Sequence, residues 1–259
     1  EKAQKLGLTL TAHCEDMDLA RGGKMNDGPL ARELGLPGIP AAAEDCGTAR
    51  EIAAAASIDA AVHICHVSTK GSVALIRDAK ARGVKVTAET CPHYLLLTQE
   101  ALRSRDADYR MNPPLRTEAD RLALIQGLQD GTIDAISTDH APHSPEEKAD
   151  FAGAPNGSIG METSLAATLT ALEGKLSLSH IIEKMSWAPA RILGIPAGTL
   201  QVGQNADVVL FDPEREWVVD PEKLHGKSKN TPFKGMTLKG KVLVTIFRGR
   251  KVYDGREEI

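Results

Sequence analysis

Residues 62–90, with the sequence VHICHVSTKGSVALIRDAKARGVKVTAET, form a strand–helix–strand unit that decides the fold class. Val62–Val67 is an apolar run, and Lys70–Arg82 has the spacing of an amphipathic helix. Gly83 ends that helix, and Val84–Ala88 is the next apolar run. Near-continuous apolar strands joined by a helix are typical of a parallel sheet with covered faces. The stretch therefore predicts an α/β fold.

The same alternation continues on both sides of this unit. Leu8–His13 and Ile133–Thr138 are further apolar runs, which we expect to be buried strands. Helices are expected at residues 1–6, 44–56, 118–129, 160–172 and 177–185, and the last helical stretch ends at Arg191-Ile192-Leu193-Gly194.

The pattern changes after Pro196. The segments 207–211, 241–248 and 251–253 have the apolar character of strands and are joined by glycine-containing turns, which favours an antiparallel sheet. We therefore expect two domains, residues 1–195 with the parallel sheet and residues 196–259 with a small β-domain.

Composition and charge exclude several classes of partner. The chain has 31 Lys and Arg against 35 Asp and Glu, a net charge of −4, which argues against a general binder of nucleic acid or anionic membranes. No apolar run reaches the roughly 18–20 residues that a membrane helix needs. The four cysteines are far apart and form no CxxC pair, which indicates reduced thiols in a cytoplasmic protein.

Ionisable side chains stand at the ends of the expected strands. The first ends at His13, the second at His66, the third runs through Glu89 towards His93, and the fourth ends at Asp139. In a β/α barrel this edge holds the active site. Buried imidazole and carboxylate groups are costly unless they are paired or bind a metal. The repetition predicts His13 and His66 as metal ligands, with Asp139 as a ligand or base; Asp139 could also be a helix N-cap.

Other histidines at these positions have weaker signals. His93 lies between Pro92 and Tyr94 in a turn and fits an ordered structural residue as well as a ligand. His140 is expected to support the site or to be structural, and His63 to be a packing residue. His143 follows Pro142 in a loop over the strand ends, where it could face a substrate.

Two turn-rich segments could present polar groups to a ligand. In residues 110–116 two prolines rigidify a loop next to Asn112, whose amide could read an amide or imide edge. Residues 154–160, with Asn156 and Gly157, could offer backbone groups. For each segment the plain alternative is an ordinary connection.

With these motifs the chain resembles the amidohydrolase superfamily, and within it the bacterial class I dihydroorotases. The resemblance covers essentially the whole chain. Residues 198–207 resemble the segment in which the chain of that family returns to its small β-domain. The matching segments are 12–16 (AHCED), 65–70 (CHVSTK), 89–95 (ETCPHYL), 109–116 (YRMNPPLR), 130–134 (DGTID) and 138–143 (TDHAPH).

The resemblance implies the C-terminal half of a (β/α)8 TIM barrel and a role for each matching residue. His13 and His66 match the histidines of the more buried metal site, and Asp139 matches the aspartate that binds the other metal and acts as general base. Asn112 and His143 match substrate-contacting residues. Asn156 and Gly157 match a loop whose backbone contacts the pyrimidine ring, although the family commonly has Phe at the position of Asn156.

The implied reaction is the reversible cyclisation of N-carbamoyl-L-aspartate to L-dihydroorotate in pyrimidine biosynthesis. Two divalent metals, expected to be Zn²⁺, would activate water and polarise the ring carbonyl. Asp139 would take a proton and pass it to the leaving nitrogen.

One family motif is missing from the chain. The His-x-His motif of the first barrel strand does not occur, and the first strand here corresponds to the fifth of the family. The chain also begins inside a helix-to-strand motif, and Glu1–Lys5 is no signal peptide. We therefore expect an N-terminally incomplete chain whose other half comes from a separate chain, or a partial sequence; a homodimer is the other expected assembly.

Two other functions stay open at this point. One is a sibling cyclic amidohydrolase, such as an allantoinase or a hydantoinase; residues 111–114 and 138–143 favour a dihydroorotase over these. The other is an inactive dihydroorotase-like scaffold that binds aspartate carbamoyltransferase. Retention of His13, His66 and Asp139 argues against it.

Overall fold

A parallel sheet lies at the centre of the computed structural model, which describes residues 1–255. Its strand order is β1-β4-β5-β6, and every neighbouring pair is parallel. The strands are β1 (Leu10–Ala12), β4 (Val62–Ile64), β5 (Val86–Thr90) and β6 (Ala135–Ile136). The predicted α/β class with a parallel sheet is confirmed, although most of the strands are shorter than the apolar runs that predicted them.

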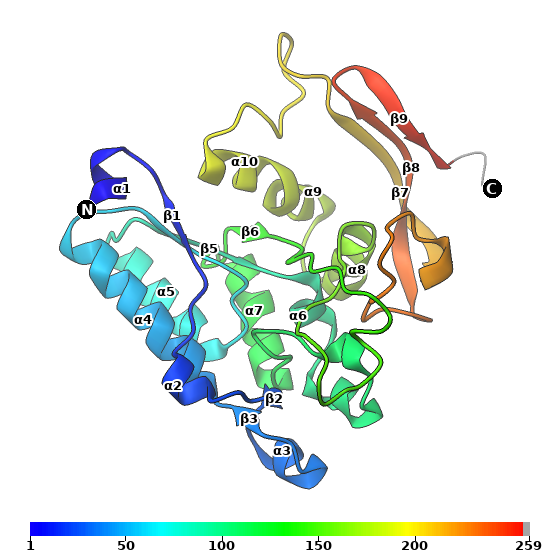
Figure 1. Ribbon diagram of the computed structural model, residues 1–259. Helices are drawn as coiled ribbons and strands as arrows, with labels where there is room; N and C mark the ends of the chain where they lie inside the picture. Colours follow the sequence, from blue (N-terminus) through cyan, green and yellow to red (C-terminus); the bar gives the residue numbers. More distant parts are fainter. Residues whose placement is uncertain (256–259) are drawn as a thin grey trace.

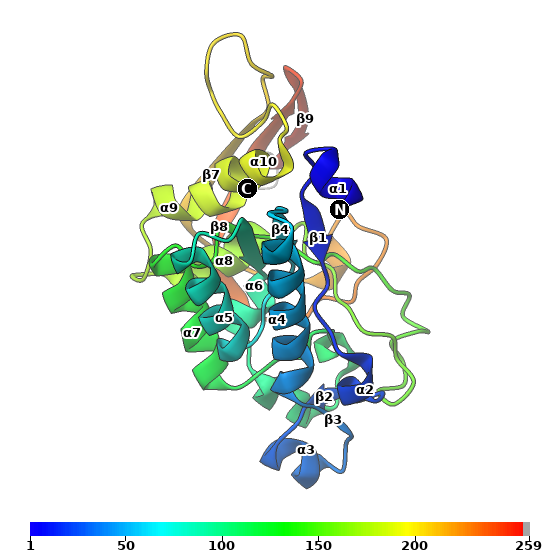
Figure 2. The ribbon, with the colours of Figure 1, turned by 90° about the vertical axis from the view of Figure 1, so that its left-hand side faces the viewer.

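Three helices cover one face of the sheet, as Figures 1 and 2 show: α4 (Ala41–Ser57), α5 (Lys70–Ala81) and α7 (Glu118–Gln129). Val62 and Ile64 of β4 point into this layer, where they join one buried apolar cluster with Ile76 of α5. Thr69 caps α5 by accepting a hydrogen bond from the Ser72 backbone N–H. Because side chains alternate along a strand, His63, between Val62 and Ile64, faces the other side of the sheet.

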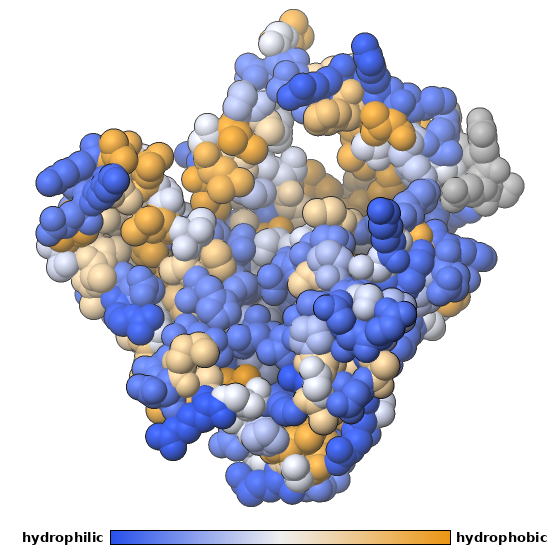
Figure 3. Space-filling model, viewed as in Figure 1, coloured by the Kyte–Doolittle hydropathy of each residue, from blue (hydrophilic) through white to orange (hydrophobic). Residues whose placement is uncertain are grey.

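The first strand is not buried as the sequence predicted. Leu8 is 57% exposed and Leu10 is 54% exposed, and Figure 3 shows apolar surface over α1 (Lys2–Lys5) and the start of β1. The reason is its place in the sheet: β1 pairs with β4 on one side and with no other strand among residues 1–255. An unpaired edge strand leaves both backbone groups and apolar side chains open to contact.

Short elements connect the strands at their carboxyl ends. β2 and β3 pair in parallel as a separate two-stranded ladder. These elements are α2 (Met17–Ala20), β2 (Met25–Asn26), α3 (Pro29–Leu34), β3 (Gly38–Ile39), α6 (Pro92–Leu96), η1 (Gln99–Ser104) and η2 (Ala107–Tyr109).

Four helical segments lie between β6 and β7. The helix predicted from residue 160 begins later, because residues 160–163 form a turn in which the Thr163 N–H donates to the Gly160 carbonyl. The predicted helix at 177–185 is α9, which continues into a π-helical turn. The segments are α8 (Ser164–Leu172), α9 (Leu178–Ile182), η3 (Glu183–Trp187) and α10 (Ala188–Leu193).

The chain ends in an antiparallel sheet of order β7-β8-β9. A second buried cluster joins α8 to this region through Ala167, Phe233 and Leu238, so the sheet packs against the helical layer. No helix among residues 1–255 is both long and apolar enough to cross a membrane. The elements are β7 (Val208–Val218), η4 (Pro221–Lys223), β8 (Thr237–Phe247) and β9 (Arg250–Asp254).

Candidate metal centre

Two histidines from neighbouring strands meet at the carboxyl edge of the parallel sheet. His13 Nδ1 lies 2.9 Å from His66 Nε2, and the ring centroids are 4.7 Å apart at an interplanar angle of 68°. His13 directly follows β1, and His66 follows β4 by two residues. The parallel register of β1 and β4 brings the two strand ends to the same height.

The environment of His66 keeps its imidazole neutral. Its Nδ1 is buried and has no hydrogen-bond partner among residues 1–255. Burial lowers the pKa of His66 below its usual value; the charge of Asp139 opposes this shift, and the charge of His13 adds to it. A neutral imidazole has a lone pair to offer a metal ion.

Asp139 brings a carboxylate to the same edge. It follows β6 and is exposed, and its carboxylate makes no hydrogen bond or ion pair with another residue of the 1–255 range. Its charge acts on the pKa of His66. Asp139 and His66 both have a left-handed backbone, with φ of 46° and 36°. Such φ values are uncommon for residues other than glycine and gather at functional sites.

Glu15 links the histidine pair to a second predicted site residue. Its Oε2 lies 3.3 Å from His13 Nε2 and accepts a hydrogen bond from Asn112 Nδ2 at 3.1 Å. A carboxylate on Nε2 favours the tautomer in which Nε2 has the proton and Nδ1, the atom that faces His66, has the lone pair. Glu15 therefore orients His13 and places Asn112 beside it.

The donor set fits a divalent metal ion. Two imidazole nitrogens at the usual 2.0–2.1 Å from a tetrahedral zinc would be about 3.3 Å apart, so a small opening of the 2.9 Å pair would admit an ion. Imidazole and carboxylate are the zinc ligands of catalytic sites. The buried, unpartnered His66 Nδ1 indicates that the ring is not held by hydrogen bonds to the surrounding protein on that side.

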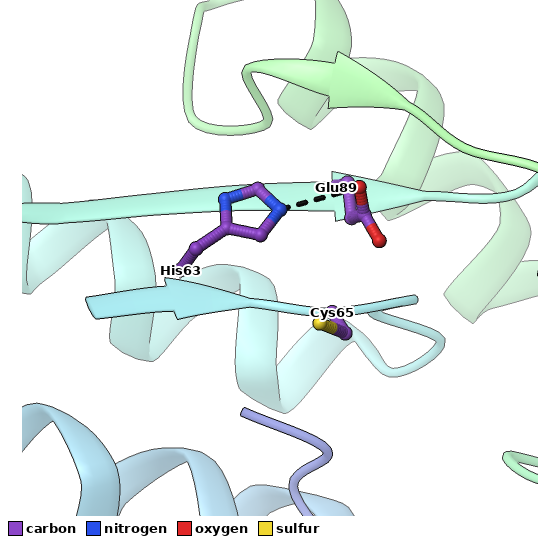
Figure 4. Close-up of side chains that lie close together, drawn as sticks. All are labelled: His63, Cys65 and Glu89. Atoms are coloured by element: carbon purple, nitrogen blue, oxygen red, sulfur yellow. Dashed lines mark ion pairs between the residues drawn. The ribbon is translucent and has the colours of Figure 1, made fainter. Parts of the chain in front are cut away.

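A second group of metal-capable side chains, His63, Cys65 and Glu89, lies on the parallel sheet (Figure 4). His63 and Cys65 come from the β4 segment and Glu89 from β5, with one potential ligand atom of each within 4.8 Å of the others. His63 Nε2 pairs with Glu89 Oε2 at 3.2 Å, and His63 Nδ1 lies 2.8 Å from Thr87 Oγ1.

The charges of this second group satisfy each other. Burial tends to raise the pKa of Glu89, but the hydrogen bond and charge of His63 outweigh it and lower the pKa. Burial, with a contribution from Glu89, raises the pKa of Cys65 to about 11, so the thiol is protonated at neutral pH. His63 is buried, as expected for a packing residue, and it is also half of an ion pair.

The three remaining predicted residues form a separate cluster. His143 Nε2 lies 3.0 Å from the Asn156 carbonyl oxygen, and the Asn156 side chain accepts a hydrogen bond from Arg110 at 3.2 Å. Gly157 has φ 123°, and a Cβ there would lie 2.4 Å from Ala141 Cβ, so the position requires glycine. The Asn156 side chain is held by Arg110, and the Gly157 N–H donates to the Arg110 carbonyl at 2.8 Å. The carbonyl oxygens of Asn156 and Gly157 each accept one hydrogen bond, so the loop can still offer a ligand the second lone pair of these oxygens.

His140 and His93, the other two histidines near the strand ends, differ in their partners. His140 Nδ1 accepts a hydrogen bond from the Gly160 N–H at 3.1 Å, which fits a structural role. His93 is buried, and its Nε2 has no partner among residues 1–255; burial, and then the charge of His66, lowers its pKa to about 3.

Sequence reasoning missed a buried network behind His66. Glu44 of α4 accepts hydrogen bonds from the backbone N–H groups of Ser68 and Thr69, at 2.9 and 3.2 Å. Arg116 donates to Ser68 Oγ at 3.1 Å and lies 3.6 Å from Glu44. The network fixes the turn that follows His66. Its one signal in the sequence is a glutamate inside an alanine-rich helix.

The chain matches known proteins over nearly its whole length. The family model described as "Amidohydrolase family" matches residues 1–252. Two relatives are a dihydroorotase of Syntrophus aciditrophicus (strain SB), 51% identical over 255 residues, and a dihydroorotase of Geobacter sp. (strain M21), 52% identical over 255 residues. Each match covers 98% of this chain and 60% of the relative.

Solved structures match with lower identity. A dihydropyrimidinase from Brevibacillus agri NCHU1002 superposes with a TM-score of 0.87 at 31% identity, and an L-hydantoinase from Arthrobacter aurescens with 0.88 at 29%. Both matches cover 98% of this chain and 58% of the other. The predicted fold class is confirmed: the chain has the fold of part of a TIM barrel, continued by a small antiparallel sheet.

Proposed function

Because this chain belongs to the amidohydrolase family, we propose that it is the metal-binding part of a dihydroorotase. The proposed reaction is the reversible cyclisation of N-carbamoyl-L-aspartate to L-dihydroorotate, a step of pyrimidine biosynthesis. The observation that supports it most is the meeting of His13 and His66 at the strand ends, beside Asp139. Relatives named dihydroorotase at 51–52% identity favour this substrate over other cyclic amides.

The proposed metal ligands are His13, His66 and Asp139. The family is in general metal-dependent, and we propose zinc, with two ions in a complete site. A bound divalent ion supplies Lewis acidity, which acidifies water and polarises the ring carbonyl. Glu15 holds the His13 ring, and the turn fixed by Glu44 holds His66.

The remaining proposed roles concern protons and substrate. Asp139, which has no partner of its own among residues 1–255, accepts a proton from water and returns it to the leaving ring nitrogen. Asn112, oriented by Glu15, and His143 contact the substrate. Asn156 and Gly157 contribute backbone groups towards the pyrimidine ring.

We propose that the complete active site also contains residues outside this chain. The chain spans about 60% of the length of the curated relatives that it matches, and it has no His-x-His motif. We propose that further barrel strands pair with the open edge of β1 and bring the other ligands, from a complementing chain or through a homodimer. We also propose residues 1–195 and 196–259 as the two domains, and a cytoplasmic location.

The test is an assay on metal-loaded chain with dihydroorotate, allantoin and hydantoin as alternative substrates. It is run on the chain alone and on the chain mixed with the part of a dihydroorotase relative that lies outside the match. Turnover of dihydroorotate by the mixture supports the proposal. Turnover of allantoin or hydantoin alone would favour the sibling enzymes, and a chain that binds no metal would favour an inactive scaffold.

A further inference from the structure

Asn230 is a buried amide whose side chain bonds only to the backbone of the candidate site's loops. It lies between η4 and β8, in the C-terminal part of the chain, and is 5% exposed. Its Oδ1 accepts a hydrogen bond from the His143 N–H at 3.2 Å. Its Nδ2 donates to the carbonyl oxygens of Ala141 at 3.1 Å and Gly157 at 3.3 Å.

These bonds join two loops that meet beside the strand end of β6. One is residues 140–143, directly after Asp139, and the other is residues 157–160. The loops already contact each other, because the Ala141 N–H donates to the Ser158 carbonyl at 2.9 Å. The backbone of Asn230 adds a further bond, since its carbonyl accepts from the Ile159 N–H at 3.1 Å.

Only a side-chain amide can satisfy this position. The loops offer one N–H donor, from His143, and two carbonyl acceptors, from Ala141 and Gly157. The side chain of asparagine has an acceptor oxygen and an NH2 group with two donors, so it matches all three. Aspartate would keep the bond to His143 but would place a carboxylate against two carbonyl oxygens. An apolar side chain would leave all three backbone groups without the partner that Asn230 supplies.

Buried residues next to Asn230 in the sequence hold its backbone in place. Phe233, three residues later, is buried in the cluster that joins α8 to the antiparallel sheet. Thr231 is fully buried, and its Oγ1 accepts a hydrogen bond from the Phe233 N–H at 3.3 Å. The amide is therefore held by a packed part of the chain that contributes no predicted site residue.

We propose that Asn230 is a positioning residue of the active site, which sets His143 and Gly157 at the spacing that receives the substrate. The proposal rests on the proposed function for the identity of that substrate, a cyclic amide. It adds that the C-terminal β-region takes part in substrate recognition through backbone groups 87 and 73 residues away in the sequence.

The test compares Asn230→Asp and Asn230→Ala with Lys227→Ala, an exposed residue of the same segment that makes no hydrogen bond or ion pair with the other residues of the 1–255 range. Amide hydrogen exchange, followed by mass spectrometry on the metal-loaded chain, measures the protection of the loop backbone and does not require turnover. The KM and kcat for dihydroorotate are measured in parallel, in the mixture described above.

For both Asn230 variants we expect exchange about tenfold faster in peptides that cover residues 140–143 and 157–160, with the rest of the chain unchanged. KM is expected to rise about tenfold while kcat changes less than about threefold, because the loops bind rather than react. Lys227→Ala should match the parent chain in all readouts.

Unchanged exchange in both loops would overturn the proposal, and so would faster exchange throughout the chain, since that would be a general structural role. A parent mixture without dihydroorotate turnover contradicts the proposed function instead. In that case the exchange result alone decides whether Asn230 positions the loops.

Discussion

His63 and His66 lie three residues apart on the same chain segment, and their surroundings are opposite. His63 has a partner at each ring nitrogen, Glu89 on one and Thr87 on the other. His66 faces another imidazole with one nitrogen and has no partner among residues 1–255 at the other. Both rings are buried.

The contrast separates a structural histidine from a ligand. Burying an imidazole is costly, and a carboxylate and a hydroxyl offset that cost for His63. For His66 no such pair is provided, and burial lowers its pKa so that the ring stays neutral. The group of His63, Cys65 and Glu89 can be stable without a metal. The pair of His13 and His66 is the one that a bound metal would stabilise most. The following experiments test this contrast.

The largest expected effect is on metal binding. His66→Ala and His13→Ala each remove one of three proposed ligands and should weaken zinc or cobalt binding by more than about 100-fold. Equilibrium dialysis with metal analysis measures this. His180→Ala is the control, since this exposed histidine bonds within its own helix start. Wild-type metal affinity in His66→Ala would contradict the assignment.

The second effect is on stability without metal. His63→Ala leaves the Glu89 carboxylate and the Thr87 hydroxyl without their buried imidazole partner and should lower the free energy of unfolding by about 3 kcal/mol. His66→Ala should cost about 1 kcal/mol or less, because it removes a buried nitrogen without a partner. Urea unfolding in the presence of a chelator compares them. Equal losses would erase the contrast.

The third effect is the response to acid. The folded pKa of His93 is about 3, so the folded chain binds fewer protons than the unfolded chain below the unfolded value of about 6.5. Stability should therefore fall as the pH drops below 6.5, by about 2 kcal/mol at pH 5. His66 adds a loss of the same sign, because its pKa is also lowered.

Glu89 should not contribute in that range, because its lowered pKa keeps the carboxylate ionised until the pH falls below its usual 4.5. Urea midpoints between pH 7.5 and 5 measure the slope. His93→Leu should flatten it, and an unchanged slope in that variant would exclude His93 as the cause.

The smallest effect concerns the carboxylates behind the two histidines. Glu15→Gln weakens the group that orients His13 and should lower metal affinity about tenfold. Glu89→Gln is the matched control, because Glu89 holds the structural histidine and should leave metal affinity within about twofold. Calorimetric titration with the metal measures the affinity of both variants. A larger loss of affinity in Glu89→Gln than in Glu15→Gln would point to His63, Cys65 and Glu89 as the metal centre.

Local patterns predicted the order of strands and helices well. Gly83 and Gly131, both with positive φ, lie two residues after the ends of α5 and α7, which the periodicity predicts, and the apolar runs predict the strands. The burial of Leu8 and Leu10 was wrongly predicted, because an apolar run does not reveal whether a strand has neighbours on both sides. The roles of the predicted site residues stay predictions.

The sequence by itself determined the parallel α/β class, the family and the set of ionisable residues at the strand ends, because strand and helix periods and short motifs are local properties of the chain. The tertiary structure decided which of those residues meet. It brings His13 to His66 and pairs His63 with Glu89. It also places Asn230 between the loops at residues 140–143 and 157–160, which are more than 70 residues away in the sequence. Such contacts depend on register and packing between distant segments, and no local pattern encodes them.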